Sequence, residues 1–159
     1  MAVASLVIEA GGSEDLAIAA LLHDAVEDQG GKETLALIRR DFGEHVADVV
    51  ARCSDADTMP KPPWRPRKEQ YIERIQSADP DTRLVSAADK LHNARSILAD
   101  FRILGDAVWR RFTGRKDGTL WYYRSMATAL QKACADPRVD PLVAELDRVV
   151  SELERLAKN

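Results

Sequence analysis

The sequence is poor in cysteine and in long apolar runs. It contains only two cysteines, Cys53 and Cys134, and they do not form a Cys-x-x-Cys motif. We therefore expect reduced thiols and no disulfide, as in cytoplasmic proteins. No apolar run reaches the roughly 20 residues that a membrane-spanning helix needs, and no N-terminal segment has the pattern of a signal peptide. These absences predict a cytoplasmic protein without a membrane partner.

An excess of charge of one sign is also missing. The 26 acidic residues outnumber the 23 basic ones only slightly, and the formal net charge is -3. This balance excludes the strong positive field that drives binding to nucleic acids or anionic membranes. We therefore expect no nucleic-acid partner, and any anion-binding site must be local.

Strand patterns and common phosphate-binding motifs are absent as well. The sequence has no alternating apolar segment, no glycine-rich phosphate loop and no Gly-x-Ser-x-Gly motif. Its 159 residues, 45% of them hydrophobic, are enough for one domain with a core. We predict an all-α fold in a single domain over residues 1–159. The expected helices cover residues 2–10, 14–28, 32–40, 44–53, 69–76, 81–98 and 140–158, with another beginning at 121–123.

One imidazole and three carboxylates follow the apolar run over residues 19–22, namely His23, Asp24, Glu27 and Asp28. At helical spacing these four side chains lie on one side of about a turn and a half. The carboxylates would repel one another there, at a helix C-terminus whose dipole already disfavours negative charge. A metal cation would relieve the repulsion. The alternative is a solvated acidic helix end that the following glycines cap.

A second polar stripe lies on the predicted helix over residues 81–98. Its apolar face is formed by Leu84, Ala88, Leu91 and Leu98. Its adjoining polar face is formed by Ser86, Asp89, Asn93 and Ser96. This pattern places a carboxylate and an amide where an apolar helix face meets a cavity. Asp89 is therefore the natural third ligand for a metal bound by His23 and Asp24.

The segment over residues 54–68 combines four prolines with four cations. The prolines forbid regular structure, so we predict an irregular loop, which we call the basic segment. Its cations are Lys61, Arg65, Arg67 and Lys68. In a slightly acidic chain, such a cluster near a metal centre suits a polyphosphate ligand, although a solvated linker stays open as the alternative.

Two motifs together resemble one enzyme family. Leu-Leu-His-Asp-Ala-Val-Glu-Asp at 21–28 and Ala-Ala-Asp-Lys-Leu-His-Asn at 87–93 are similar to motifs of the HD-domain phosphohydrolases. The chain looks like the branch that hydrolyses the alarmone (p)ppGpp, in the RelA/SpoT proteins and the small alarmone hydrolases. The resemblance covers roughly residues 3–130. It implies an HD-type helical bundle that hydrolyses guanosine 3′,5′-bis(diphosphate) to GDP, or the pentaphosphate to GTP, and pyrophosphate.

The metal centre expected from the residues agrees with the one that this resemblance implies. One divalent ion would be held by His23, Asp24 and Asp89. Oxygen-rich ligation with an imidazole suits manganese, and the family resemblance also implies manganese. A water on the ion would become a usable nucleophile near neutral pH. Glu27 and Asp28 would orient this water and accept its proton.

The resemblance further implies how a guanosine polyphosphate would be bound. Asn93 would hold the ribose and a phosphate, Tyr122 the nucleotide, and Lys68 a terminal phosphate. The remaining charged residues of the second motif, Lys90 and His92, we interpret as structural, paired with neighbouring carboxylates. The expected partner is thus a small-molecule nucleotide.

One departure from the family concerns the first metal ligand. The family takes another histidine from the preceding helix, and residues 1–12 resemble only the end of that helix. The histidine, and the basic residues that precede it, would therefore stand upstream of Met1. Either the start of the chain has been lost or mis-assigned, or this is a natural short form with an incomplete site.

Two other functions stay open at this point. The chain can be another HD phosphohydrolase that acts on ordinary nucleotides or cyclic dinucleotides. It can also be a catalytically silent nucleotide-binding or scaffold domain, in which His23, Asp24 and Asp89 form a polar network. The last predicted helix is either packing material or a dimer surface, so a homo-oligomer also stays open.

Overall fold

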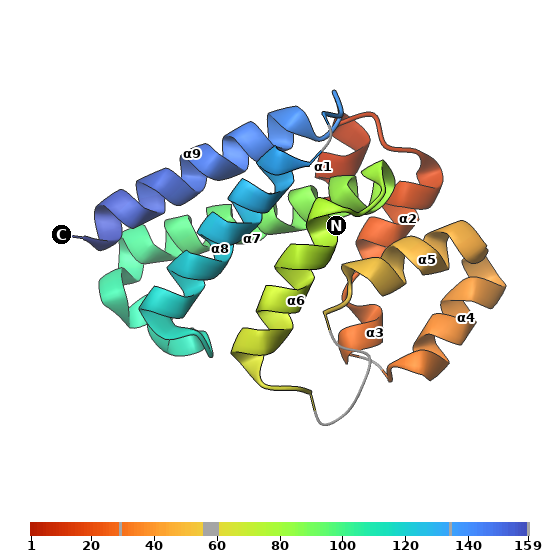
Figure 1. The fold of residues 1–159 in the computed structure, drawn as a ribbon, viewed down its shortest axis with the longest axis horizontal. Helices are drawn as coiled ribbons and strands as arrows, with labels where there is room; N and C mark the ends of the chain where they lie inside the picture. The colour runs from red at the N-terminus through yellow and green to blue at the C-terminus, as the bar shows by residue number, and fades with distance from the viewer. Residues whose placement is uncertain (29, 56–60, 134, 159) are drawn as a thin grey trace.

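The computed structural model describes residues 1–28, 30–55, 61–133 and 135–158, which form helices and turns without a strand. The predicted all-α fold is therefore confirmed (Figure 1). The elements are α1 (Ala2–Glu9), α2 (Glu14–Leu22), α3 (Ala25–Asp28), α4 (Lys32–Phe42), α5 (Glu44–Cys53), α6 (Trp64–Gln76), α7 (Pro80–Leu104), the 3-10 helix η1 (Gly105–Arg111), α8 (Arg115–Lys132) and α9 (Asp140–Ala157). None of these helices is long and apolar enough to cross a bilayer.

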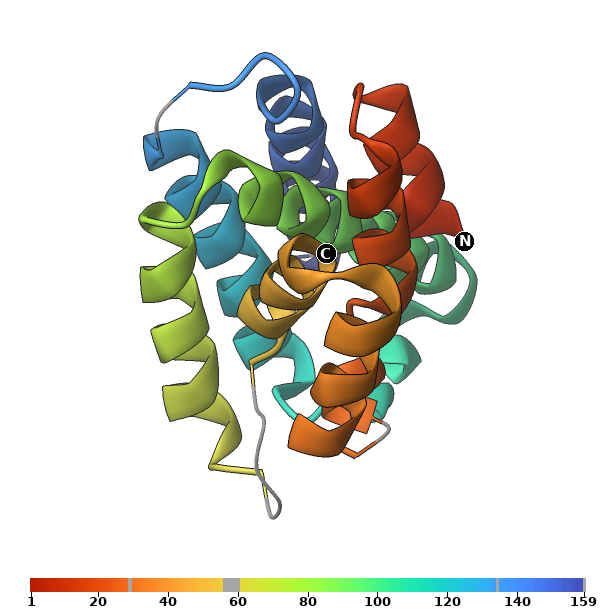
Figure 2. The ribbon, with the colours of Figure 1, turned by 90° about the vertical axis from the view of Figure 1, so that its right-hand side faces the viewer.

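The long helix α7 runs through the middle of the bundle and packs against α1, α2, α5, α8 and α9 (Figures 1 and 2). Asp79 caps its N-terminus, where the carboxylate accepts hydrogen bonds from the Thr82 backbone N–H at 2.9 Å and from the Thr82 hydroxyl at 2.7 Å. Pro80 follows in the first turn, where a helix does not need its N–H. The helix that carries Asp89 is thus started by strong local signals.

The two predicted stripes of α7 are confirmed except at one end. All four residues of the apolar stripe are buried: Leu84, Ala88, Leu91 and Leu98. In the polar stripe, Ser86 and Asp89 are buried and Asn93 is partly buried. Ser96 is instead exposed, and its hydroxyl bonds to the backbone carbonyl of His92 at 3.0 Å. The polar stripe therefore reaches the interior only as far as Asn93.

Helices α1 and α2 form a tight hairpin through Gly11 and Gly12. Gly11 has a φ of 83°, a conformation that favours glycine. A Cβ on Gly12 would lie 2.5 Å from Val7 Cγ1 and 2.8 Å from the Val7 carbonyl oxygen, so a side chain does not fit there. Ser13 then caps α2 by accepting a hydrogen bond from the Leu16 N–H, as predicted. This hairpin places the end of α2 against α7.

The prediction of one helix over residues 14–28 is wrong, because the helix breaks at the motif itself. Helix α2 ends at Leu22, residues 23–24 form a turn, and α3 begins at Ala25. The His23 Nδ1 lies 2.8 Å from the carbonyl oxygen of Ala20, the acceptor that a continuous helix would pair with the N–H of residue 24. The imidazole thus takes the carbonyl oxygen of Ala20 that the next residue of a continuous helix would need as its acceptor.

The basic segment is also more regular than predicted. Helix α6 begins at Trp64 rather than at Glu69, and Pro63 takes the N-cap position. Pro66 is accommodated because it lies in the first turn, where no N–H is needed for an intrahelical bond. Arg65, Arg67 and Lys68 therefore project from a helix, which gives their side chains fixed directions.

The last helix, α9, is packing material. Its apolar face packs against α7 and α8. Leu146, Val149 and Leu153 are buried there, and Leu142 and Leu156 are partly buried against the same core. This face is therefore not a dimer surface, and the homo-oligomer stays a prediction. Of the two cysteines, Cys53 is a free thiol and partly buried, and Cys134 lies outside the described residues.

Candidate metal centre and anion cleft

His23, Asp24 and Asp89 meet where the end of α2 faces α7. The His23 Nε2 lies 3.1 Å from Asp24 Oδ2 and 3.3 Å from Asp89 Oδ1. The His23 side chain is 13% exposed and that of Asp89 is 9% exposed, whereas Asp24 is 65% exposed. The turn after α2 and the middle of α7 thus bring one imidazole and two carboxylates together, and this meeting agrees with the sequence prediction. Their role as metal ligands stays a prediction.

The imidazole of His23 lies in an unusual electrostatic position. Because the Nδ1 bonds to a carbonyl oxygen, the Nδ1 carries a proton and the Nε2 of the neutral ring has only a lone pair. This Nε2 is buried and makes no hydrogen bond to any described residue, although two carboxylate oxygens lie close to it. Burial alone would lower the pKa of His23, but Asp24 and Asp89 outweigh it and raise the pKa to about 10. The site therefore requires a positive charge, either a proton or a metal cation, at the Nε2.

Asp89 is held by its own helix. Lys90 Nζ lies 2.5 Å from Asp89 Oδ2, and Asn93 Nδ2 donates to Asp89 Oδ1 at 2.6 Å. Burial would raise the pKa of Asp89, but the charges of Lys90 and His23 outweigh it and hold this pKa far below its usual range. Asp89 is thus an ionised carboxylate with a fixed direction. The predicted structural role of Lys90, pairing with a carboxylate, agrees with this contact.

The donor set fits a divalent ion in kind. An imidazole nitrogen without a hydrogen bond and two carboxylates are ligands that first-row divalent metals accept. However, among the described residues no group of three or more His, Cys, Asp or Glu side chains is arranged to hold a metal as it stands. The reason lies in the contacts above: Lys90 and Asn93 engage both oxygens of Asp89, and His23 touches the two carboxylates directly. A bound ion would have to replace the direct contacts of His23.

Two residues, Glu27 and Asp28, were predicted to orient the water and accept its proton, and the structure describes the side chain of Glu27 alone. Glu27 lies on α3 and turns to the basic segment: its Oε1 accepts from Lys61 Nζ at 2.8 Å and from Arg67 Nη1 at 3.5 Å. Its carboxylate is therefore paired with two cations of the basic segment. Asp28 is the last residue of α3, and its side chain lies outside the described residues.

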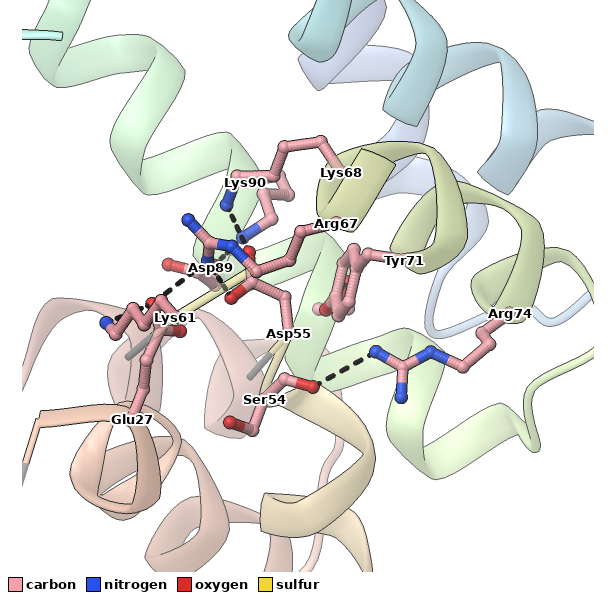
Figure 3. Close-up of polar contacts among 11 residues, drawn as sticks. Glu27, Ser54, Asp55, Lys61, Arg67, Lys68, Tyr71, Arg74, Asp89 and Lys90 are labelled. Atoms are coloured by element: carbon pink, nitrogen blue, oxygen red, sulfur yellow. Dashed lines mark hydrogen bonds and ion pairs between the residues drawn. The ribbon is translucent and has the colours of Figure 1, made fainter. Parts of the chain in front are cut away.

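The cations of the basic segment are paired with carboxylates (Figure 3). Asp55 accepts hydrogen bonds from Arg67 Nη1 and Lys68 Nζ, and its side chain is only 5% exposed. Lys68, predicted to hold a terminal phosphate, is thus engaged by Asp55. Burial lowers the pKa of Lys68, and Asp55 offsets this only in part. The four cations of the basic segment, all in its described part, are therefore held in ion pairs.

A cleft of about 270 Å³ opens beside these cations. Its walls include Glu27, Trp64, Arg67, Lys68, Arg111, Phe112 and Tyr122. The Tyr122 ring lies between two ammonium groups, 4.8 Å from Lys68 Nζ and 5.8 Å from Lys90 Nζ. The Tyr122 hydroxyl is buried without a hydrogen-bond partner among the described residues, and burial raises its pKa. The prediction that Tyr122 reaches the site thus agrees with the geometry.

Three residues of the site were missed or undervalued in the sequence. Asp55 gave no signal, because it is one of several acids before the prolines and its partners lie 12 and 13 residues away. Lys90 was assigned a pairing role only, yet its ammonium also faces the rings of Tyr71, at 5.4 Å, and Tyr122. Tyr71 is buried, and its hydroxyl is hydrogen-bonded to Ser86 at 3.0 Å, so the ring that faces the Lys90 ammonium is held in place. A lysine between two buried tyrosines is visible only in three dimensions.

The chain is similar to known proteins. The HD domain family matches residues 1–119 of the chain. The guanosine-3′,5′-bis(diphosphate) 3′-pyrophosphohydrolase MESH1 of Mus musculus is 37% identical over 97 residues, which cover 60% of this chain and 51% of that protein. The guanosine-3′,5′-bis(diphosphate) 3′-pyrophosphohydrolase of Haemophilus influenzae is 31% identical over 103 residues, or 61% of this chain and 14% of that protein.

A solved structure is similar over nearly the whole chain. The crystal structure of lmo0812 from Listeria monocytogenes has a TM-score of 0.85 and 31% sequence identity, and the match covers 99% of this chain and 97% of that one. The match with MESH1 is shorter: it spans about half the length of that relative. The family match and this shared fold lead to one conclusion: the chain belongs to the HD domain family.

Proposed function

We propose that this chain is a metal-dependent hydrolase that removes the 3′-diphosphate of guanosine 3′,5′-bis(diphosphate). The products would be pyrophosphate and GDP, or GTP from the pentaphosphate. The observation that carries the proposal is the approach of His23 Nε2 to Asp24 and Asp89. Lys90, which pairs with Asp89, lies 5.8 Å from the ring of Tyr122 in the wall of a cleft lined by cations. Relatives named as 3′-pyrophosphohydrolases support the same substrate. The chain matches only part of each of these relatives, so their activity is carried over as a proposal.

Membership of a family of HD hydrolases implies a divalent metal, and we propose manganese. His23, Asp24 and Asp89 would hold it, with the imidazole neutral and its Nε2 lone pair used for ligation. When bound, such an ion acidifies a water and offsets charge on phosphoryl oxygens. The role of the chain is to keep the donors ready: Lys90 and Asn93 keep Asp89 ionised and oriented, and the Ala20 carbonyl fixes the tautomer of His23.

The charge distribution of the cleft suits a polyphosphate. Arg67, Lys68 and Tyr122 line the cleft and would contact phosphoryl oxygens. Asn93 does not line this cleft and bonds to Asp89, and we propose that it holds the ribose and a phosphate. Glu27 lies on the same cleft with its carboxylate paired to Lys61 and Arg67. We propose that a phosphoryl group takes over these cations, which leaves the Glu27 carboxylate able to accept a proton from the attacking water. Asp28 would assist it.

A substrate panel tests this function. The purified chain, supplied with Mn²⁺, should release pyrophosphate from a guanosine 3′-diphosphate and leave 5′-monophosphates and cyclic dinucleotides intact. Chelation should abolish the release, and added Mn²⁺ should restore it. Hydrolysis of 5′-monophosphates or cyclic dinucleotides in preference to the 3′-diphosphate would instead identify another HD phosphohydrolase.

A second candidate is a catalytically silent nucleotide-binding domain. It is favoured by the observation that the described residues contain no ready group of three metal-binding side chains. In this case His23 would be protonated and would form ion pairs with Asp24 and Asp89. Elemental analysis of the purified protein separates the two candidates. A near-stoichiometric transition metal supports the hydrolase, whereas a stable protein that stays metal-free after incubation with Mn²⁺ supports the silent domain.

A further inference from the structure

Asp55 occupies a position behind the cations of the cleft. It follows α5 directly, and its carboxylate receives hydrogen bonds from Arg67 and Lys68 in the first turns of α6 (Figure 3). Arg67 and Lys68 line the 270 Å³ cleft, whereas Asp55 does not. Asp55 lines a separate cavity of about 380 Å³ together with Lys32, Arg39 and other residues. The two cations therefore lie between Asp55 and the cleft.

The contacts leave this pair of cations with unused binding capacity. Glu27 also accepts from Arg67 and pairs with Lys61, so two carboxylates, Asp55 and Glu27, face three cations, and the group carries a net charge of about +1. Arg67 Nε is buried and makes no hydrogen bond to the described part of the chain. The Tyr122 hydroxyl, on the same cleft, is also without a partner there. An oxyanion in the cleft would supply acceptors for both groups.

The affinity of Arg67 and Lys68 for such an anion depends on how far their side chains are fixed before binding. Arginine and lysine side chains have many rotamers, and fixing them on binding reduces affinity. Asp55 fixes both in the unliganded protein, because they share its carboxylate and their side chains are only 11% and 17% exposed. The order required for binding is therefore present before the ligand arrives.

We propose that Asp55 is a positioning residue that holds Arg67 and Lys68 as one phosphoryl-binding pair for the cleft. The inference rests on the proposed function for the kind of anion, a diphosphate. It adds that the anion approaches from the side opposite Asp55 and does not displace it. Neutralising Asp55 therefore weakens anion binding, although it makes the site more positive.

Isothermal titration with inorganic pyrophosphate tests this on the full chain after removal of metals. Asp55→Asn should bind pyrophosphate about tenfold more weakly than the unaltered protein, the scale expected when two long side chains must be ordered on binding. The charge-matched control is Asp48→Asn, a change of an exposed carboxylate that pairs with Arg39 on α4, and it should leave the affinity unchanged. A double-mutant cycle with Arg67→Gln should show that the two losses are less than additive.

Equal or tighter binding by Asp55→Asn would overturn the inference, because it would mean that Asp55 competes with the anion. If Asp55→Asn does not fold, Asp55→Glu keeps the charge but shifts the carboxylate by one methylene. A folded Asp55→Glu with unchanged affinity also overturns the inference, and weakened binding supports it. Hydrolysis of the 3′-diphosphate is assayed on the same unaltered protein. Without hydrolysis the proposed function fails, while the pyrophosphate result still decides the role of Asp55.

Discussion

The candidate metal centre and the basic segment are built in different ways. Asp89 lies on α7 in the core, and its partners Lys90 and Asn93 are one and four residues away on the same helix. Arg67 and Lys68 lie partly buried on α6, and their partner Asp55 is a dozen residues away across several prolines. The first site is therefore fixed by a packed helix, whereas the second is fixed by ion pairs between segments. Loss of charge should consequently damage the two regions to different extents.

The largest effect is expected for Asp89→Ala in the metal centre. Losing a ligand should weaken metal affinity by more than the roughly 100-fold seen for residues behind a ligand. Stability should fall by about 3–5 kcal/mol, because Lys90 would lose the partner of a buried ion pair. Metal titration and denaturant unfolding measure the two effects. Asp100→Ala, on the exposed part of the same helix and paired with Arg111, should change stability by less than about 1 kcal/mol. Retained metal binding and activity in Asp89→Ala would reject this site.

Glu27→Gln tests the residue of the first motif that pairs with the basic segment. The amide keeps an acceptor for Lys61 but cannot take a proton, so kcat should fall by about 10²- to 10⁴-fold with the metal content unchanged. Steady-state kinetics together with elemental analysis measure this. Glu69→Gln, which alters an exposed pair with Arg65, is the control and should have little effect. An unchanged kcat would show that Glu27 is only a counter-ion of the basic segment.

A smaller effect is expected for Asn93→Ala, which removes the amide that orients Asp89. Metal affinity should fall by about 10- to 100-fold, because the residue acts behind a ligand. Ser96→Ala on the exposed side of the same helix should bind metal as the unaltered protein does. If the two variants have the same metal affinity, Asn93 contacts substrate only or has no role in the centre.

The smallest effect concerns Asp79, the carboxylate that starts α7. Burial would raise its pKa, but bonds from Thr82 and Arg52 outweigh burial and lower it from 3.8 to about 2. Since the pKa is lower in the folded state, the ionised group stabilises the fold above its usual pKa, and this contribution is lost as the pH falls towards 2. Asp79→Ala should cost about 1 kcal/mol near neutral pH, as for other helix caps. Denaturant unfolding at several pH values should show the difference shrinking below pH 4. A constant difference would exclude a role for its charge.

The sequence predicted the meeting of His23, Asp24 and Asp89 better than the structure of the basic segment, and the reason is physical. Asp89 follows from helical periodicity, because the apolar stripe of α7 fixes which side chains face inward. The prediction that His23 belongs to the site follows from its position directly after a buried apolar run. The break of the helix at His23 does not follow, since it depends on a bond between the imidazole and the Ala20 carbonyl. A helix prediction from periodicity assumes that each backbone carbonyl accepts a hydrogen bond from a backbone N–H and not from a side chain.

The sequence identified the cations of the basic segment but not the helix that carries three of them. Counting prolines led to an irregular loop, although Pro66 fits the first turn of α6. Asp55 could not be selected, because the ion pairs depend on how α5 and α6 meet. Lys90 shows the same limit, since its position between Tyr71 and Tyr122 needs the fold. Local signals thus identify residues on one helix, and contacts between segments require coordinates.

The most direct test of the account is anomalous diffraction from crystals of the protein grown with Mn²⁺. The account predicts one strong manganese peak within bonding distance of His23 Nε2 and of the carboxylates of Asp24 and Asp89. The direct contacts between His23 and these carboxylates, 3.1 Å and 3.3 Å, should then be replaced by bonds to the metal. A map without such a peak, with His23 still in direct contact with Asp89, would contradict it.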